Sequence, residues 1–226
     1  MDRTRENFPE KTDSAYKSAY KSTYKPEDKI ADRNASENSD KDAGKATAES
    51  ASTAQKNFYC LYIRTGLEWD FVREMQPVLD SGESPCRGRL YCLGKQMRLK
   101  NGKEYIDTIF PSYVFWETDS FEGFSVLQKG KGFVKILPHN SEPAPLNSTD
   151  VSVVCSFLKY GTVMPILHVD FDVNDKIQIL DGLFKGQEGL VVAVNRRNKR
   201  VNLEIQFMNG TRIIGLSYEL IKKVKE

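Results

Sequence analysis

Few residues in this sequence have the type and spacing that catalysis or metal binding would require. The four cysteines are Cys60, Cys86, Cys92 and Cys155. Five residues separate Cys86 from Cys92, which is not a zinc-ligand spacing, and His139 and His168 each stand apart from any cysteine. A GxSxG nucleophile elbow and a phosphate-cradling P-loop are both missing. We therefore predict four reduced thiols, no metal, no cofactor and no enzymatic activity.

Aromatic side chains gather in two segments, FYCLYIRTG (58–66) and IFPSYVFWE (109–117), which suggests binding chemistry. Strand alternation in the second segment would place Phe110, Ser112, Val114 and Trp116 on one side and Tyr113 on the other. One set could fill a core while the other lines a groove, because rigid aromatics suit the apolar face of a partner helix. For Phe58 and Phe110, core packing is an equally good explanation.

A basic stripe follows the first aromatic segment, and no acidic residue occurs between Ser84 and Lys103. Its members are Arg87, Arg89, Lys95, Arg98, Lys100 and Lys103. Such a stripe, with Tyr91 interleaved, could hold phosphates and stack a base. A solvated hairpin whose lysines discourage edge pairing is the competing interpretation. We predict nucleic-acid contact here.

Composition divides the chain into four parts. Residues 1–56 are polar and nearly lack Leu, Val and Ile, so we expect a disordered leader. Residues 57–158 predict the order β-α-β-β-β-α-β-α, an α+β sandwich with helices flanking a mostly antiparallel sheet. Residues 159–171 are expected to be a linker. Residues 172–226 predict short strands at 175–180, 188–195, 200–207, 211–216 and 219–224, which would close into an SH3-like β-barrel.

Charge and hydropathy exclude some classes of protein. The net charge is only +2, from 33 basic and 31 acidic residues, so any nucleic-acid binding must come from a local patch. No apolar run reaches the length of a membrane span, and the N-terminus lacks the apolar core of a signal peptide. We expect a cytoplasmic monomer without membrane association.

Two motifs in family order and at family separation resemble the NusG family over residues 57–226. NDKIQILDGLFKGQEGLVVAVN (174–195) is similar to the KOW motif, and IFPSYVFWE is similar to the FPGYV strand of the NusG amino-terminal domain. Segment 195–210 and the ending SYELIKKV resemble the LoaP group of processive antiterminators, with RfaH a more distant relative. Ser112 stands where the family pattern usually has glycine.

The resemblance implies a non-enzymatic transcription elongation factor, specialised as a processive antiterminator. It implies docking on the clamp helices of the RNA polymerase largest subunit through Phe58, Tyr59, Phe110, Pro111 and Tyr113. The basic stripe would lie near a nascent RNA hairpin or non-template DNA. The barrel would recruit Rho or a small-subunit ribosomal protein through Phe184, Ile213, Arg196 and Arg197. The alternative is a KOW-domain RNA-binding protein with a translational or ribosomal role and no polymerase contact.

Overall fold

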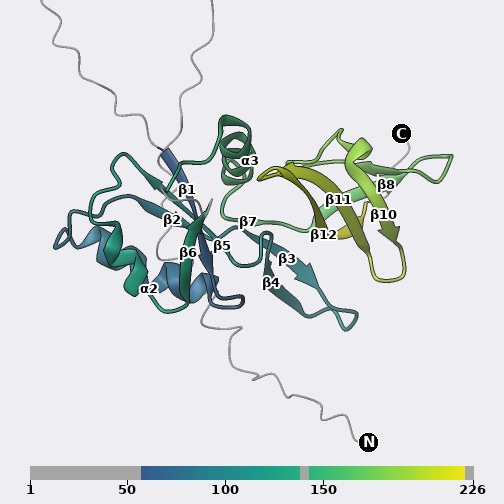
Figure 1. The fold of residues 1–226 in the computed structure, drawn as a ribbon. Helices are drawn as coiled ribbons and strands as arrows, with labels where there is room; N and C mark the ends of the chain where they lie inside the picture. The colour runs from purple at the N-terminus through teal and green to yellow at the C-terminus, as the bar shows by residue number, and fades with distance from the viewer. Residues whose placement is uncertain (1–56, 138–142, 222–226) are drawn as a thin grey trace, which may run out of the picture. The chain divides into compact units, whose positions relative to one another are not determined.

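The computed structural model describes residues 57–137 and 143–221 (Figure 1). The leader predicted over 1–56, the end of the last predicted strand and His139 lie outside the described residues. No helix among the described residues is long and apolar enough to cross a membrane.

The first sheet has the strand order β2-β5-β1-β6. Its strands are β1 (Asn57–Ile63), β2 (Arg89–Tyr91), β5 (Tyr113–Thr118) and β6 (Phe133–Leu137). The central strand β1 pairs antiparallel with both β5 and β6. Because successive strand residues point to opposite faces, each face of this sheet can cover a different core.

Helix α2 (Glu68–Asp80) covers one face of the first sheet. Its buried Phe71, Met75 and Leu79 recur at the four-residue spacing of a helical stripe. They pack with Leu61 of β1 and Trp116 of β5, and the 3-10 helix η1 (Phe124–Lys129) completes this layer. The helix expected after the first strand is thereby confirmed.

A second group of strands forms around the predicted hairpin. Strand β3 (Gly94–Arg98) pairs antiparallel with β4 (Glu104–Thr108), and the turn between them contains Lys100, Asn101 and Gly102. Strand β3 also pairs parallel with β7 (Val163–Met164). Helix α3 (Ser148–Leu158) is capped by Asn147, whose side chain accepts from the backbone N–H of Asp150.

The C-terminal sheet has the strand order β10-β11-β12-β8-β9. Its elements are β8 (Leu167–Phe171), β9 (Ile177–Ile179), the 3-10 helix η2 (Glu188–Leu190), β10 (Val191–Asn195), β11 (Arg200–Phe207) and β12 (Gly210–Leu220). Two details differ from expectation. Segment 159–171 contains β7 and β8 and is not a plain linker, and one long strand β12 replaces the two predicted from residue 211 onward. The fold class, α+β followed by a β-rich C-terminal region, is confirmed.

The second hydrophobic core joins the first sheet to the C-terminal sheet. It contains Phe58, Cys60 and Phe110, then Phe157 of α3, and then Phe207 of β11. Helix α3 lies beside β11 and β12 (Figure 1), so the face of the first sheet opposite α2 is covered by both α3 and the C-terminal sheet. The boundaries 57–158 and 172–226 stay a prediction.

Candidate functional site

The candidate docking residues divide into a buried set and an exposed set. Phe58, Tyr59 and Phe110 are buried, with exposed fractions of 6%, 8% and 4%. Tyr59 packs on the α2 side against Trp116, whereas Phe58 and Phe110 belong to the core shared with the C-terminal sheet. Pro111 is exposed and Tyr113 is half-buried.

Three aromatic rings surround the Phe110 side chain. Its centroid is 4.5 Å from that of Phe207 with the planes at 28°, which is a stacked pair. It meets Phe115 and Phe157 edge to face at 5.9 and 5.7 Å. Such pairs each contribute about 0.5–1.5 kcal/mol beyond the area that they bury. In this structure, therefore, Phe207 of β11 occupies the position that a docking partner of Phe110 would take.

The predicted alternation was wrong at Phe110, because Phe110 precedes the strand. Phe110 to Tyr113 form a turn, in which the Tyr113 backbone N–H donates to the Phe110 carbonyl at 3.1 Å. Ser112 has φ +72°, the left-handed conformation that a type II turn needs at its third residue. Because of this turn, the Phe110 side chain lies on the opposite face of the sheet from the one that strand alternation predicts. Phe110 therefore packs in the same core as Phe115 and not in the core that contains Val114.

Buried polar contacts hold Ser112 in this conformation. The Ser112 backbone N–H donates to Glu68 Oε1 at 2.6 Å, and Glu68 is only 1% exposed. The Gly66 backbone N–H donates to the other oxygen of the same carboxylate at 2.9 Å. The hydroxyls of Ser112 and Thr65 lie 2.6 Å apart. Sequence reasoning missed Glu68, because a glutamate in the first turn of a helix is usually solvated.

Two half-buried tyrosines form the accessible part of the aromatic site. Tyr62 of β1 and Tyr113 of β5 face each other across the sheet with ring centroids 6.1 Å apart. The Arg212 guanidinium lies 5.8 Å from the Tyr113 ring centre and donates to its hydroxyl at 3.2 Å. Lys135 lies 6.0 Å from the Tyr62 ring. An apolar partner could reach this tyrosine pair, which two cations flank.

A polar contact fastens the C-terminal sheet to α3. Met208 and Asn209 form the turn between β11 and β12, both with positive φ. The Met208 backbone N–H donates to Asp150 Oδ1 at 2.7 Å, and Asn147 Nδ2 donates to Asp150 Oδ2 at the same distance. Asp150 is only 5% exposed, so its charge strengthens both bonds.

The basic stripe is not a continuous row of unpaired cations. Lys95 is nearly buried and lies 3.4 Å from Asp107 of β4, and Arg98 pairs with Glu104 of β4 and Glu219 of β12. Arg87 donates to the carbonyl of Cys86 at 3.1 Å and to those of Gly82 and Ser84. Arg89, Lys100 and Lys103 are exposed. Glu104 and Asp107 follow the stripe directly in sequence on the paired strand β4, whereas Glu219 lies 121 residues from Arg98 and could not be inferred from the local sequence.

The residues predicted for the barrel partner also lie in different environments. Phe184 is 3% exposed and packs against Phe157 of α3 with centroids 6.0 Å apart, so it is an interior residue here. Arg196 stacks over Phe171 at 4.0 Å and pairs with Asp175. Ile213 is 54% exposed, and Arg197 is exposed.

The cysteines are poor nucleophiles in this fold. Burial raises the pKa of the Cys86 thiol to about 11, and it raises the pKa values of Cys60 and Cys92 still further above the ordinary thiol range. Each thiol therefore stays protonated near neutral pH. Within residues 57–137 and 143–221, no group of three or more potential metal ligands comes together.

Comparison with known proteins finds both curated relatives and solved structures that are similar to this chain. No family model matches the chain. The transcription termination/antitermination protein NusG of Streptococcus pyogenes serotype M3 is 32% identical over 114 residues, which cover 47% of this chain and 62% of that protein. The protein of the same name from Neisseria meningitidis serogroup B is 21% identical over 136 residues, covering 58% of this chain and 75% of that protein. A solved structure described as domain interaction in Thermotoga maritima NusG has a TM-score of 0.44 at 13% identity, covering 72% of this chain and 94% of that chain. The chain thus spans less than two thirds of the streptococcal relative that it matches.

Proposed function

We propose that this chain is a member of the NusG family and that it regulates elongation or termination of transcription by RNA polymerase. It would act by binding and not by catalysis. Its place of action would be the cytoplasm, where the polymerase transcribes. We further propose that it works as a processive antiterminator, for which the support is the LoaP-like sequence of segment 195–210.

The tyrosine pair Tyr62–Tyr113 is the observation that carries the polymerase-docking proposal. It offers rigid aromatic area at low conformational entropy, and the exposed Pro111 lies beside it. Clamp helices of the largest polymerase subunit would first meet this pair. The clamp helices could contact Phe58 and Phe110 only if the C-terminal sheet separated from the first sheet, because Phe207 and α3 cover these two residues.

The remaining contacts are proposed for surfaces that stay accessible. Arg89, Lys100 and Lys103 would touch a nascent RNA hairpin or the non-template DNA strand. Ile213 and Arg197 would contribute to a surface for Rho or a small-subunit ribosomal protein. Phe184 could join that surface only after separation from Phe157, so its role is tied to movement of the C-terminal sheet.

Capture of core RNA polymerase by the immobilised full chain tests the docking proposal. Tyr113→Ala should reduce capture severalfold, because it removes half of the tyrosine pair. Tyr160→Ala is the matched control, since Tyr160 is 48% exposed and lies after α3. Capture that is equal for both variants would refute docking at Tyr113. Co-sedimentation with ribosomes in the absence of any polymerase capture would instead support the KOW-type RNA-binding alternative.

Transcription in vitro across a set of terminators tests the proposed outcome of binding. An antiterminator should increase the read-through product in proportion to polymerase occupancy, and Tyr113→Ala should reverse that increase. A decrease in read-through would show that the protein promotes termination.

A further inference from the structure

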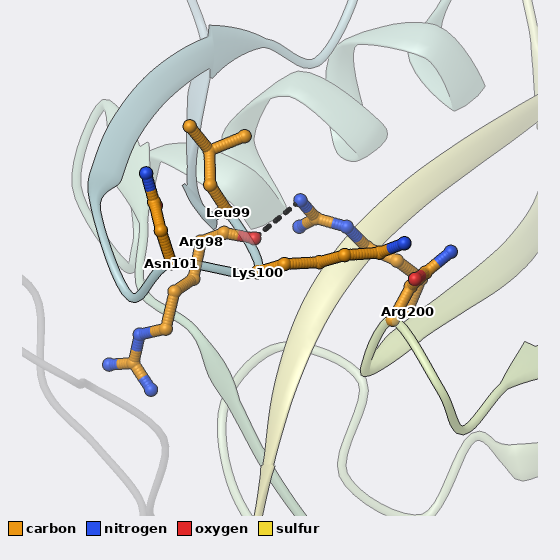
Figure 2. A pocket seen from close by; sticks show the side chains of 6 residues that line it. Arg98, Leu99, Lys100, Asn101 and Arg200 are labelled. Atoms are coloured by element: carbon orange, nitrogen blue, oxygen red, sulfur yellow. Dashed lines mark hydrogen bonds between the residues drawn. The ribbon is translucent and has the colours of Figure 1, made fainter.

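Two basic turns that are about 100 residues apart in sequence line one hollow. The first is the turn of the β3–β4 hairpin, and the second is the turn between β10 and β11. The hollow has a volume of about 490 Å³ (Figure 2). Its lining residues are Arg98, Leu99, Lys100, Asn101, Asn198 and Arg200.

The cations of this hollow differ in how they are neutralised. Arg98 forms ion pairs with Glu104 and Glu219, and its side chain extends away from Arg200 in Figure 2. Arg200 donates to the Arg98 carbonyl at 2.7 Å and to Met97 Sδ at 3.4 Å. These acceptors leave its positive charge in place. Among residues 57–137 and 143–221, no carboxylate forms an ion pair with Arg200 or Lys100.

Each of the two turns that line the hollow contributes one of the two cations. Figure 2 shows Lys100 extending from the hairpin turn toward the turn that carries Arg200. The second turn is held by bonds from the Asn198 backbone N–H to Asn195 Oδ1 and from the Lys199 backbone N–H to the Arg196 carbonyl. Its exposed Arg197 and Lys199 extend the positive surface beyond the hollow. Cations without a carboxylate partner, beside an amide donor, match the phosphates of a nucleic-acid backbone.

We propose that the hollow between the β3–β4 and β10–β11 turns binds the phosphate backbone of a nucleic-acid strand, with Lys100 and Arg200 contacting phosphates from the two turns. The proposal rests on the nucleic-acid contact proposed above for the hairpin, and it adds the C-terminal sheet as the second half of the site. Both halves are needed, because each turn supplies one of the two cations without a carboxylate partner.

The composite site also links strand binding to the position of the C-terminal sheet. The two walls meet where Ser217 Oγ accepts from the Arg98 backbone N–H at 3.0 Å and Arg98 pairs with Glu219. The same arrangement places Phe207 over Phe110. A bound strand should therefore favour the covered state of the aromatic core, since a ligand stabilises the state that forms its site.

Fluorescence anisotropy tests the proposal. It measures the affinity of the full chain for a labelled 20-nucleotide single strand, as RNA and as DNA, across a KCl series. Lys100→Gln and Arg200→Gln remove one cation from each wall, and Arg197→Gln removes an exposed cation beside the second. Lys131→Gln and Lys185→Gln are matched controls at exposed lysines elsewhere. Circular dichroism confirms that each variant is folded.

Each hairpin or turn variant should lower affinity severalfold and reduce the slope of log affinity against log salt by about 0.7 for one single-strand phosphate contact. The controls should leave both unchanged. If Lys100→Gln lowers affinity and neither turn variant does, the hairpin contact stands and the composite site is overturned. If no variant lowers affinity, both proposals fail. An equal loss in the controls would show general charge attraction and also overturn the site. Tighter binding of RNA than of DNA, or the reverse, identifies the strand.

Discussion

Replacing Asp150 with alanine should loosen the C-terminal sheet from α3 and expose Cys60. Cys60 is fully buried in the core shared by the two sheets. Its thiol lies close enough to Asp150 and Arg212 for both charges to act on it. Cys60 therefore lies near the junction of α3 and the C-terminal sheet, and its reactivity reports whether that junction is closed.

The magnitude follows from the bonds that Asp150 makes. A hydrogen bond to a buried charged group contributes about 1.5–3 kcal/mol, and every 1.4 kcal/mol changes an equilibrium tenfold. Losing the Met208 bond should thus raise the open population by about 10- to 150-fold. Asn147→Ala removes the helix cap and its bond to Asp150 but leaves the Asp150–Met208 contact. It should cost about 1 kcal/mol, or roughly fivefold.

Thiol labelling followed by mass-spectrometric mapping measures these differences. A Cys155→Ser background removes the half-exposed thiol of α3. Cys86 and Cys92, buried on the α2 side of the first sheet, report global unfolding in the same sample. Cys60 should label faster in Asp150→Ala than in Asn147→Ala, while Cys86 and Cys92 stay protected.

Two results would refute this reasoning. Equal Cys60 labelling in Asp150→Ala and Asn147→Ala would mean that the Asp150–Met208 bond does not hold the sheet. Parallel acceleration of Cys60, Cys86 and Cys92 would mean that the chain unfolds as a whole and that no separate opening exists.

Two further predictions follow from the fold. Ser112→Val should lower the free energy of unfolding, measured by urea titration, by about 1–3 kcal/mol, because a β-branched side chain is strained at φ +72°. The free energy of unfolding of Ser112→Gly should stay within about 1 kcal/mol of the parent value. Equal effects of the two substitutions would show that backbone strain is not the cause. A nucleic-acid single strand at 100 times its Kd should slow Cys60 labelling by about 100-fold if it binds only the closed arrangement. An unchanged labelling rate would show that the strand binds the open and closed arrangements equally well.

Local signals in the sequence were enough to predict many elements. Strand β11 coincides with the predicted 200–207, and a turn that contains Asn101-Gly102 joins β3 to β4. In both cases turn chemistry and apolar alternation lie within a few residues of each other. The aromatic segment 109–117 was recognised for the same reason. The turn at Ser112 was not, because serine seldom adopts the positive φ that glycine favours there.

Features that depend on distant partners could not be predicted. Strands β7 and β8 are short, and each pairs in parallel with a strand from another part of the chain, β3 and β12 respectively. A two-residue strand such as β7 has no periodicity of its own. The same reason applies to Arg98 of the basic stripe, because its partner Glu219 lies 121 residues away in sequence.

The proposed docking surface and the protein core share residues, and this overlap sets the affinity for a polymerase partner. Phe110 can stack on Phe207 or meet a partner helix, but it cannot do both. If docking needs the uncovered state, the apparent dissociation constant equals the intrinsic value divided by the uncovered fraction. Each contact that closes the junction, such as the Asp150–Met208 bond, then weakens docking by the same factor by which it lowers opening. The C-terminal sheet does not compete with a partner for the tyrosine pair, because the pair remains accessible in the closed arrangement. It can therefore supply the first contact, after which partner binding offsets the cost of moving the C-terminal sheet.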